Sequence, residues 1–138
     1  MIILCVDYGD ARTGLAVCDE SEILASPVGT LFEKDKARLI EKISHIAGER
    51  KAELIVVGDP VNMDGSRGFR SEACHEFAKE LSGVCNLPFE MWDERLTTVA
   101  AHNVLNFTDT RGKKRKKAVD TLSAVMILEG FLARKKSL

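Results

Sequence analysis

A net charge of one sign, long apolar runs and a recognisable leader are all missing from this sequence, and each absence excludes a class of protein. The 138 residues carry 20 basic and 21 acidic side chains, so the overall charge predicts no partner, and a nucleic-acid role has to rest on local charge. No apolar stretch has the length of a bilayer span. We therefore expect no membrane segment and a cytoplasmic location.

Cysteine is present but never in a C-x-x-C pair, which excludes the usual spacing of zinc ligands. Two of the four cysteines, Cys5 and Cys18, fall in apolar runs typical of strands. We expect small buried thiols and a reducing compartment.

Chain length and apolar content indicate one folded domain. A chain of 138 residues that is 45% apolar buries a sizeable core but leaves little room for two. Neither an internal repeat nor a linker is visible. We therefore predict a single domain over residues 1–138.

The order of the apolar segments predicts an α/β fold. Strands are expected at 2–6, 14–18, 27–32, 54–57 and 87–92. Helices are expected at 35–50, around Ala73, Phe77, Leu81 and Val84, at 98–105 and at 118–133, with connections at 59–69 and 106–117. The early hairpins require antiparallel pairing, whereas the alternating half requires parallel strands. The prediction is a mixed five-stranded sheet with helices on both faces.

Carboxylates stand at the ends of three buried elements. Asp7 closes the first apolar strand, the pair Asp93-Glu94 follows the fifth strand, and Asp120 lies in the first turn of the last helix. Taken singly, each has an ordinary explanation, because aspartate caps turns and acidic residues suit the first turn of a helix. Taken together, they favour a site for cations, since converging carboxylates repel one another without one.

Such a site suits phosphodiester hydrolysis. Mg²⁺ or Mn²⁺ prefers oxygen ligands, and Mg²⁺ is often held by one or two carboxylates together with substrate phosphate. Two ions stabilise both the attacking and the leaving oxygen. We therefore predict a metal-dependent nuclease whose catalytic metal ligands are Asp7, Asp120 and a carboxylate of the pair Asp93-Glu94.

A basic tract at 111–117 carries six positive charges just before Asp120. A run of this kind is either a solvated surface or a phosphate-contacting loop, and its position favours the loop. No aromatic residue interleaves with it, so stacking on single-stranded bases has no support. The residues expected to bind nucleic acid here are Lys113, Lys114, Arg115, Lys116 and Lys117.

Two further arginines lie close to the acidic candidates. Arg12 and Arg95 each either contact a phosphate or pair with an acidic neighbour, and the sequence favours neither. The histidines His45, His75 and His102 are scattered, and we expect them to be ordinary surface or packing residues.

Four segments together resemble one family. They are DYGDARTGLAVCD (7–19), VVGDPVNMDGSRG (56–68), DERLTT (93–98) and KAVDTLSAVMIL (117–128). They are similar in order and spacing to the YqgF-type family of ribonuclease-H-like proteins, and the resemblance spans nearly the whole chain. Its members are described as nucleases that trim the precursor of small-subunit ribosomal RNA, or as Holliday-junction-resolvase-like proteins.

The resemblance implies a ribonuclease H strand order and a metal site at Asp7, Glu94 and Asp120, with Asp93 as an alternative to its neighbour. It also implies that Arg12, Arg95, Asn62 and Asp64 contact substrate or shape the loop beside the site. One departure is Asp59, because relatives usually read glycine, an apolar residue, then proline. An aspartate here either joins the metal site or is a solvated turn residue, and we favour the turn residue.

The expected activity is hydrolysis of structured nucleic acid, processing the 5′ end of precursor 16S ribosomal RNA. Alternatives are a Holliday-junction resolvase and a binding module that recognises nucleic acid by shape without cleaving it. An ATPase of the actin type is disfavoured, because that architecture needs two domains. The chain is expected to be a monomer or a homodimer, and junction resolution, which calls for two active sites, would favour the dimer.

Overall fold

The computed structural model describes residues 1–96 and 112–137, with side chains described over 1–95 and 122–136. In these parts the strands are β1 (Ile3–Asp7), β2 (Arg12–Cys18), β3 (Ala25–Phe32), β4 (Leu54–Asp59) and β5 (Phe89–Asp93). The helices are α1 (Lys36–Arg50), α2 (Phe69–Cys85) and α4 (Gly112–Ser137), and a single 3₁₀ turn, η1, covers Glu94–Leu96.

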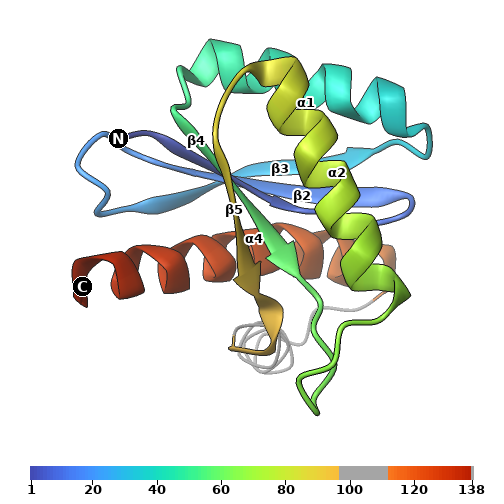
Figure 1. Ribbon diagram of the computed structural model, residues 1–138. Helices are drawn as coiled ribbons and strands as arrows, with labels where there is room; N and C mark the ends of the chain where they lie inside the picture. Colours follow the sequence, from blue (N-terminus) through green and yellow to red (C-terminus); the bar gives the residue numbers. More distant parts are fainter. Residues whose placement is uncertain (97–111, 138) are drawn as a thin grey trace.

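The predicted mixed five-stranded sheet is confirmed. Its strand order is β3-β2-β1-β4-β5. The first three strands pair antiparallel, while β4 runs parallel to β1 and to β5. Figure 1 shows β1, β4 and β5 ending towards the same edge of the sheet, as parallel strands must.

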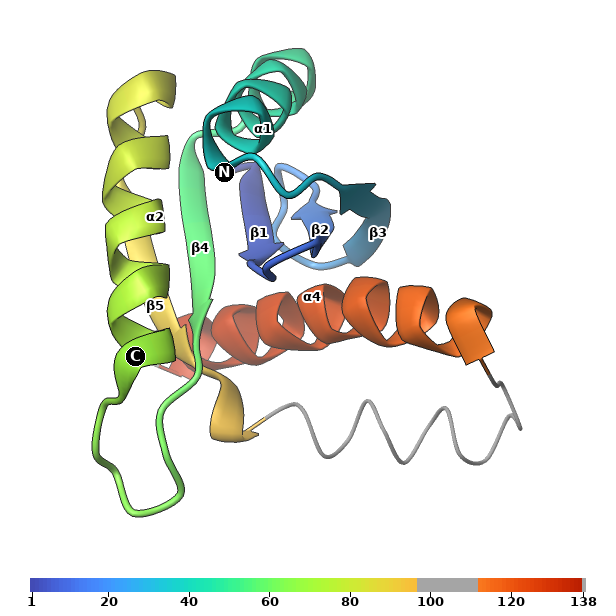
Figure 2. The same ribbon diagram turned by 90° about the vertical axis from the view of Figure 1, so that its right-hand side faces the viewer.

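Helices cover both faces of the sheet, and the strands alternate their side chains between them. In β1, Ile3 and Cys5 pack with α4, whereas Leu4 and Val6 pack with α1 and α2. Figure 2 shows α4 crossing one face while α1 and α2 lie on the other. The two faces form two separate apolar clusters, and both are fully buried at their centres.

Most elements begin and end close to their predicted bounds. Asp35 caps α1 by accepting a hydrogen bond from the Arg38 N–H at 3.1 Å. The expected helix at 98–105 lies outside the described residues. None of the described helices is long and apolar enough to cross a bilayer.

The last helix is longer than predicted. The expected helix spanned 118–133 after a basic connection, but α4 begins at Gly112 and ends at Ser137. The prediction of a loop over the basic tract was therefore wrong for residues 112–117. Apolar periodicity stops at Lys117, whereas lysine and arginine are good helix formers and continue the helix without it.

Candidate metal centre at the carboxyl ends of β1, β4 and β5

The candidate site lies where the parallel strands end. β1 ends at Asp7, and its face follows from strand periodicity: Ile3 and Cys5 pack against α4, so Asp7 continues towards that face. Its side chain is half-buried. The register that pairs Val6 with Val57 places Gly58 of β4 beside Asp7. Asp7 therefore stands next to a residue without a side chain.

Glu94 occupies the space that Gly58 leaves. A Cβ atom on Gly58 would come within 2.9 Å of both Cγ and Cδ of Glu94, and within 3.0 Å of Cδ1 of Ile127 in α4. The glutamate side chain therefore folds back from η1 over β4, on the α4 face of the sheet. Glycine is required at position 58 because the close approach leaves no room for a methyl group.

This folding back brings two carboxyl groups together. Asp7 and Glu94 share a side-chain hydrogen bond. Burial raises the pKa of Glu94, while the bond to Asp7 and the charge of Arg70 lower it in part. Two adjacent carboxylates need either a shared proton or a cation between them. The charges of Asp7 and Glu94 also add to burial in raising the pKa of Cys5, which lies beneath them.

The donor set fits a hard divalent cation. Mg²⁺ takes oxygen ligands, keeps several waters and is often bound by one or two carboxylates together with substrate phosphates, so two carboxylates are a sufficient protein contribution. Among the described side chains, no group of three or more histidine, cysteine or acidic residues is placed to hold a metal. The third predicted ligand, Asp120, lies on α4, but its side chain is outside the described part.

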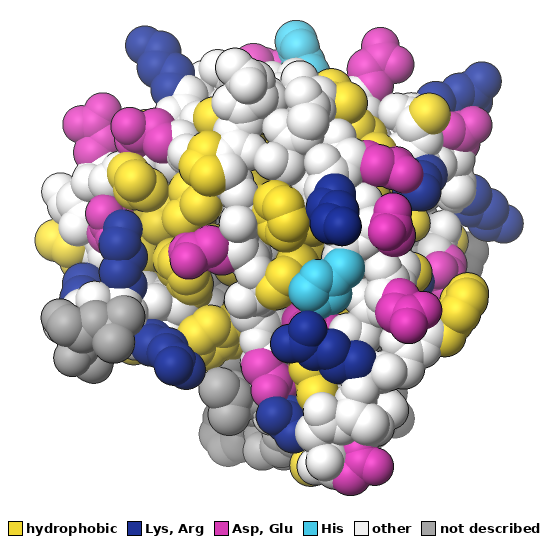
Figure 3. All heavy atoms as spheres, viewed as in Figure 1, with side chains coloured by type: hydrophobic (Ala, Val, Ile, Leu, Met, Phe, Trp, Pro, Cys, Tyr) yellow, Lys and Arg dark blue, Asp and Glu magenta, His cyan; other side chains and the backbone are white. Residues whose placement is uncertain are grey.

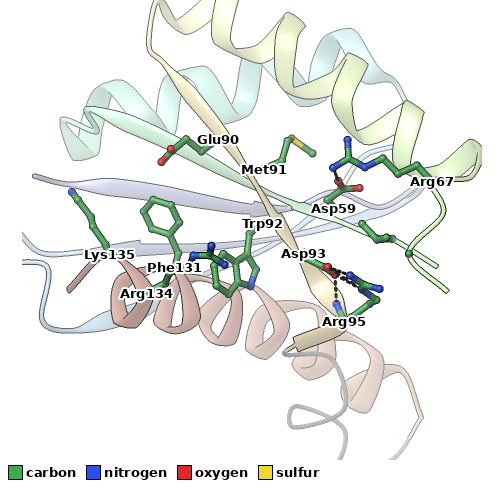
Figure 4. Close-up of a pocket in the computed structure, with 12 residues that line it drawn as sticks. Asp59, Arg67, Glu90, Met91, Trp92, Asp93, Arg95, Phe131, Arg134 and Lys135 are labelled. Carbon is green, nitrogen blue, oxygen red and sulfur yellow. Dashed lines mark hydrogen bonds and ion pairs between the residues drawn. The ribbon is translucent and has the colours of Figure 1, made fainter. Parts of the chain in front are cut away.

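Asp93, the alternative to Glu94, is engaged elsewhere. Its carboxylate accepts hydrogen bonds from Arg95, at 2.6 Å from Nη2 and 2.9 Å from Nε (Figure 4). The Arg95 guanidinium holds the pKa of this carboxyl below its usual value. Of the two possibilities left open for Arg95, pairing with an acidic neighbour is the one observed. The geometry therefore favours Glu94 over Asp93 as a ligand.

Asp59 is not the solvated turn residue that we favoured. β4 extends two residues beyond its predicted end, so Asp59 is still in the strand, and it is only 2% exposed. It lies on the opposite face from Gly58, towards α2, where it accepts a hydrogen bond from Ser71 Oγ at 2.5 Å. His75 Nε2 is 3.2 Å from the Asp59 carboxylate. Arg67 Nη2 is 3.7 Å from the same carboxylate (Figure 4). His75 is therefore not an isolated surface residue, because it pairs with a buried carboxylate.

The loop between β4 and α2 is held by its own side chains. Asn62 Nδ2 donates to Ser66 Oγ at 3.0 Å, and Asp64 Oδ1 accepts from the Ser66 N–H at 2.9 Å. The Gly65 N–H donates to the Asn62 carbonyl at 2.8 Å, and Gly65 has a φ of +89°, a conformation that favours glycine. Arg95 Nη1 also reaches the Asn62 carbonyl at 3.4 Å. Asn62 and Asp64 thus hydrogen-bond within the loop, and their role towards substrate stays a prediction.

The remaining predicted residues are placed by their backbone. Arg12 is the first residue of β2, one turn after Asp7. The five basic residues from Lys113 to Lys117 lie in the first turns of α4, on the same helix as Asp120. Figure 3 shows basic and acidic side chains interspersed on the face that it draws in colour, without a continuous basic surface there.

A cavity of about 580 Å³ opens along the outer edge of β5 (Figure 4). Trp92 and Phe131 form its apolar wall, and Arg67, Arg95 and Arg134 contribute cations to its lining. Neither Asp7 nor Glu94 lines it. The cavity is therefore a neighbour of the candidate metal centre and not part of it.

Two residues of the site were not found from the sequence. Gly58 carries a usable signal, since a glycine at the end of a buried strand often marks a close approach. Arg70 carries none, because it lies in a helix whose apolar pattern does not involve it. Its guanidinium donates to the Tyr8 carbonyl at 2.6 Å and to Asp10 Oδ1 at 2.8 Å.

Comparison with known proteins shows the family of the chain. A family model described as RuvX, Holliday junction resolvase, matches residues 1–134. The chain belongs to this family. A relative from Ruminiclostridium cellulolyticum, named "putative pre-16S rRNA nuclease", is 41% identical over 135 residues, which is 97% of this chain and 95% of the relative. One of the same name from Bacillus cereus is 40% identical over 137 residues, covering 98% of this chain and 100% of the relative.

Two solved resolvases have a fold similar to that of this chain. Thermus thermophilus RuvC, in complex with a Holliday junction substrate, superposes with a TM-score of 0.64 at 13% identity, covering 99% of this chain and 97% of that one. The fowlpox virus resolvase with junction DNA gives a TM-score of 0.61 at 12% identity, covering 98% and 99%. The family and the ribonuclease-H-like fold expected from the motifs are thus confirmed, and the chain is a member of a nuclease family.

Proposed function

We propose that this RuvX-family chain is a divalent-metal-dependent nuclease that hydrolyses phosphodiester bonds in structured nucleic acid. The observation that carries the proposal is the contact between the Asp7 and Glu94 carboxyl groups where β1 and β5 end. Burial of Glu94 makes the contact of two charged carboxylates costly unless they share a proton or bind a cation, and we propose the cation. Asp120, on α4, is the third ligand that we propose.

Each part of the site has a role in this proposal. Asp7, Glu94 and Asp120 hold Mg²⁺ or Mn²⁺, which when bound supplies a nucleophilic water and stabilises the leaving oxygen. The bonded loop at 60–68 offers a fixed surface beside the site, because its hydrogen bonds are already made. Lys113 to Lys117, and Arg12, contact the phosphate backbone, which would make the affinity sensitive to salt.

The names of the relatives guide the choice of substrate. Because two relatives of about 40% identity are named for precursor 16S ribosomal RNA, we propose the 5′ end of that RNA as the first substrate. Branched DNA is the second candidate, since two similar folds have been solved with junction DNA. Resolving a junction calls for two active sites, so a homodimer would favour DNA and a monomer the RNA. Either activity would be cytoplasmic.

The test incubates the purified chain with a precursor ribosomal RNA fragment and with a synthetic four-way junction, in Mn²⁺ or in EDTA. Asp7→Asn should abolish cleavage while leaving the circular dichroism spectrum unchanged. Asp19→Asn is the matched control, because Asp19 is exposed just after β2, at the opposite end of the sheet. Cleavage in EDTA, or undiminished cleavage by Asp7→Asn, would refute the proposal. Binding that persists in EDTA without cleavage in any divalent ion would instead indicate a binding module.

A further inference from the structure

Arg70 connects the first turn of α2 to the turn that follows Asp7. Its Nη2 donates to the Tyr8 carbonyl at 2.6 Å, and its Nη1 pairs with Asp10 Oδ1 at 2.8 Å. Its guanidinium also lies over the Tyr8 ring, 5.0 Å from the centroid. One side chain therefore makes three contacts with a turn of four residues between β1 and β2.

The same turn is held by a few other contacts, because the Ala11 carbonyl accepts a hydrogen bond from the Glu33 N–H at 3.0 Å and the Gly9 N–H donates to Thr13 Oγ1 at 3.4 Å. Asp10 is 92% exposed, and its carboxylate contacts Arg70. Gly9 doubles back so closely on the following residues that an added Cβ would come within 2.0 Å of the Arg12 carbonyl oxygen. The Tyr8 ring stacks on Phe77 of α2 with centroids 3.9 Å apart. Arg70 and this ring stack thus hold the turn against α2, starting at the residue next to Asp7.

The charge of Arg70 also reaches the acidic pair. It lowers the pKa of Glu94 against the raising effect of burial, and does the same for Cys74. The contacts that Arg70 makes are with Tyr8 and Asp10, the first and third residues after Asp7.

We propose, on the basis of the metal centre described under Proposed function, that Arg70 is a positioning residue: by holding the Tyr8 carbonyl and the Asp10 carboxylate, it fixes Asp7 at the place where it meets Glu94. Partners that hydrogen-bond a metal ligand directly are worth about 10- to 100-fold in metal affinity, and Arg70, which acts through the residue next to Asp7, is expected near the lower end of that range. Arginine suits the role because its planar fork serves two acceptors at once, whereas lysine is a single point charge.

The test compares Arg70→Lys, which keeps the charge and loses the fork, with Arg50→Lys, the same change at the exposed end of α1. Mn²⁺ affinity is measured by electron paramagnetic resonance of the free ion, and hydrogen exchange is followed over residues 8–12. We expect Arg70→Lys to weaken Mn²⁺ binding by about tenfold or more and to speed exchange in the turn. Cleavage should recover at saturating Mn²⁺, which a lost contact with substrate would not allow. Arg50→Lys should change neither quantity.

Asp10→Asn is the second variant, because Asp10 is exposed and its replacement leaves the core intact. It removes the ion pair but keeps the bond to the Tyr8 carbonyl, so we expect Mn²⁺ affinity to fall by only about two- to fivefold. If Arg70→Lys folds but keeps the parent's Mn²⁺ affinity and hydrogen exchange, the role of Arg70 is overturned and the metal centre stands. If Arg70→Lys does not fold, the same result in Asp10→Asn overturns that role. Failure of the unmodified chain to bind Mn²⁺ would overturn the metal centre of the proposed function and this role with it.

Discussion

Adding one methyl group near the carboxyl end of β4 tests how Glu94 reaches Asp7. In Gly58→Ala, the new Cβ would lie 2.9 Å from Cγ and Cδ of Glu94 and 3.0 Å from Cδ1 of Ile127. Carbon atoms pack best about 3.5–4.0 Å apart, so each contact is too short by about 0.5–1 Å. Ile127 is fully buried and cannot withdraw, which leaves Glu94 as the side chain that moves.

The size of the effect follows from that movement. Overpacking of this kind costs about 1–3 kcal/mol of unfolding free energy. A catalytic group displaced by about 1 Å can cost about 100-fold in rate. We therefore expect Gly58→Ala to stay folded, to bind Mn²⁺ more weakly and to lose about 100-fold in cleavage rate.

The assay pairs a Mn²⁺ titration with cleavage of the best substrate, and urea denaturation reports stability. Gly48→Ala is the matched control, because no atom lies within 4 Å of the Cβ that it adds in α1. That change should stabilise the helix by about 0.5–1 kcal/mol and leave activity untouched. Parent-like Mn²⁺ affinity in Gly58→Ala would show that Glu94 does not need the space above β4, and would refute the reasoning.

Two further predictions concern buried groups on the α2 face and in the core. Asp59→Ala should lower the unfolding free energy by about 1–3 kcal/mol in urea, because it leaves the fully buried Ser71 hydroxyl without its acceptor, whereas Asp59→Asn, which keeps an acceptor, should lose less. Equal stability of the two variants would contradict this. Brief alkylation of the native chain should modify Cys85 first, because the other three cysteines are buried and burial raises the pKa of Cys74 to about 12. Mass spectrometry with a denatured control checks it, and rapid native labelling of Cys74 would be the contrary result.

The part of the candidate site that lies at strand ends could be located from the sequence. Asp7 and a carboxylate of the pair Asp93-Glu94 were predicted to share a site because each stands at the end of a buried element, and in the structure Asp7 and Glu94 share a side-chain hydrogen bond. The choice between Glu94 and Asp93 could not be made from the sequence. Only the structure shows that Arg95 pairs with the Asp93 carboxylate and that Gly58 leaves room for the Glu94 side chain.

The sequence-based errors have identifiable physical causes. Because β4 was predicted to end at Val57, Asp59 was expected in a turn. The strand in fact continues to Asp59, which places this side chain on the α2 face in contact with Ser71. Ending the apolar pattern at Lys117 concealed the helical character of the basic tract. Arg70 could not be predicted, because its partners Tyr8 and Asp10 are about 60 residues away along the chain.

The length of α4 has a mechanical consequence. One uninterrupted helix holds the basic tract at its start and, from Ser123 to Leu132, many of the side chains that seal one face of the sheet. Asp120 stands one turn before that sealed stretch. A slip of the helix by one turn, about 5.4 Å, would therefore open the core and carry the proposed third ligand away in the same movement. The packing of α4 on the sheet thus fixes the position of Asp120 along the helix axis. Substitutions in the core under α4 would therefore move Asp120 and weaken the proposed metal centre without touching it.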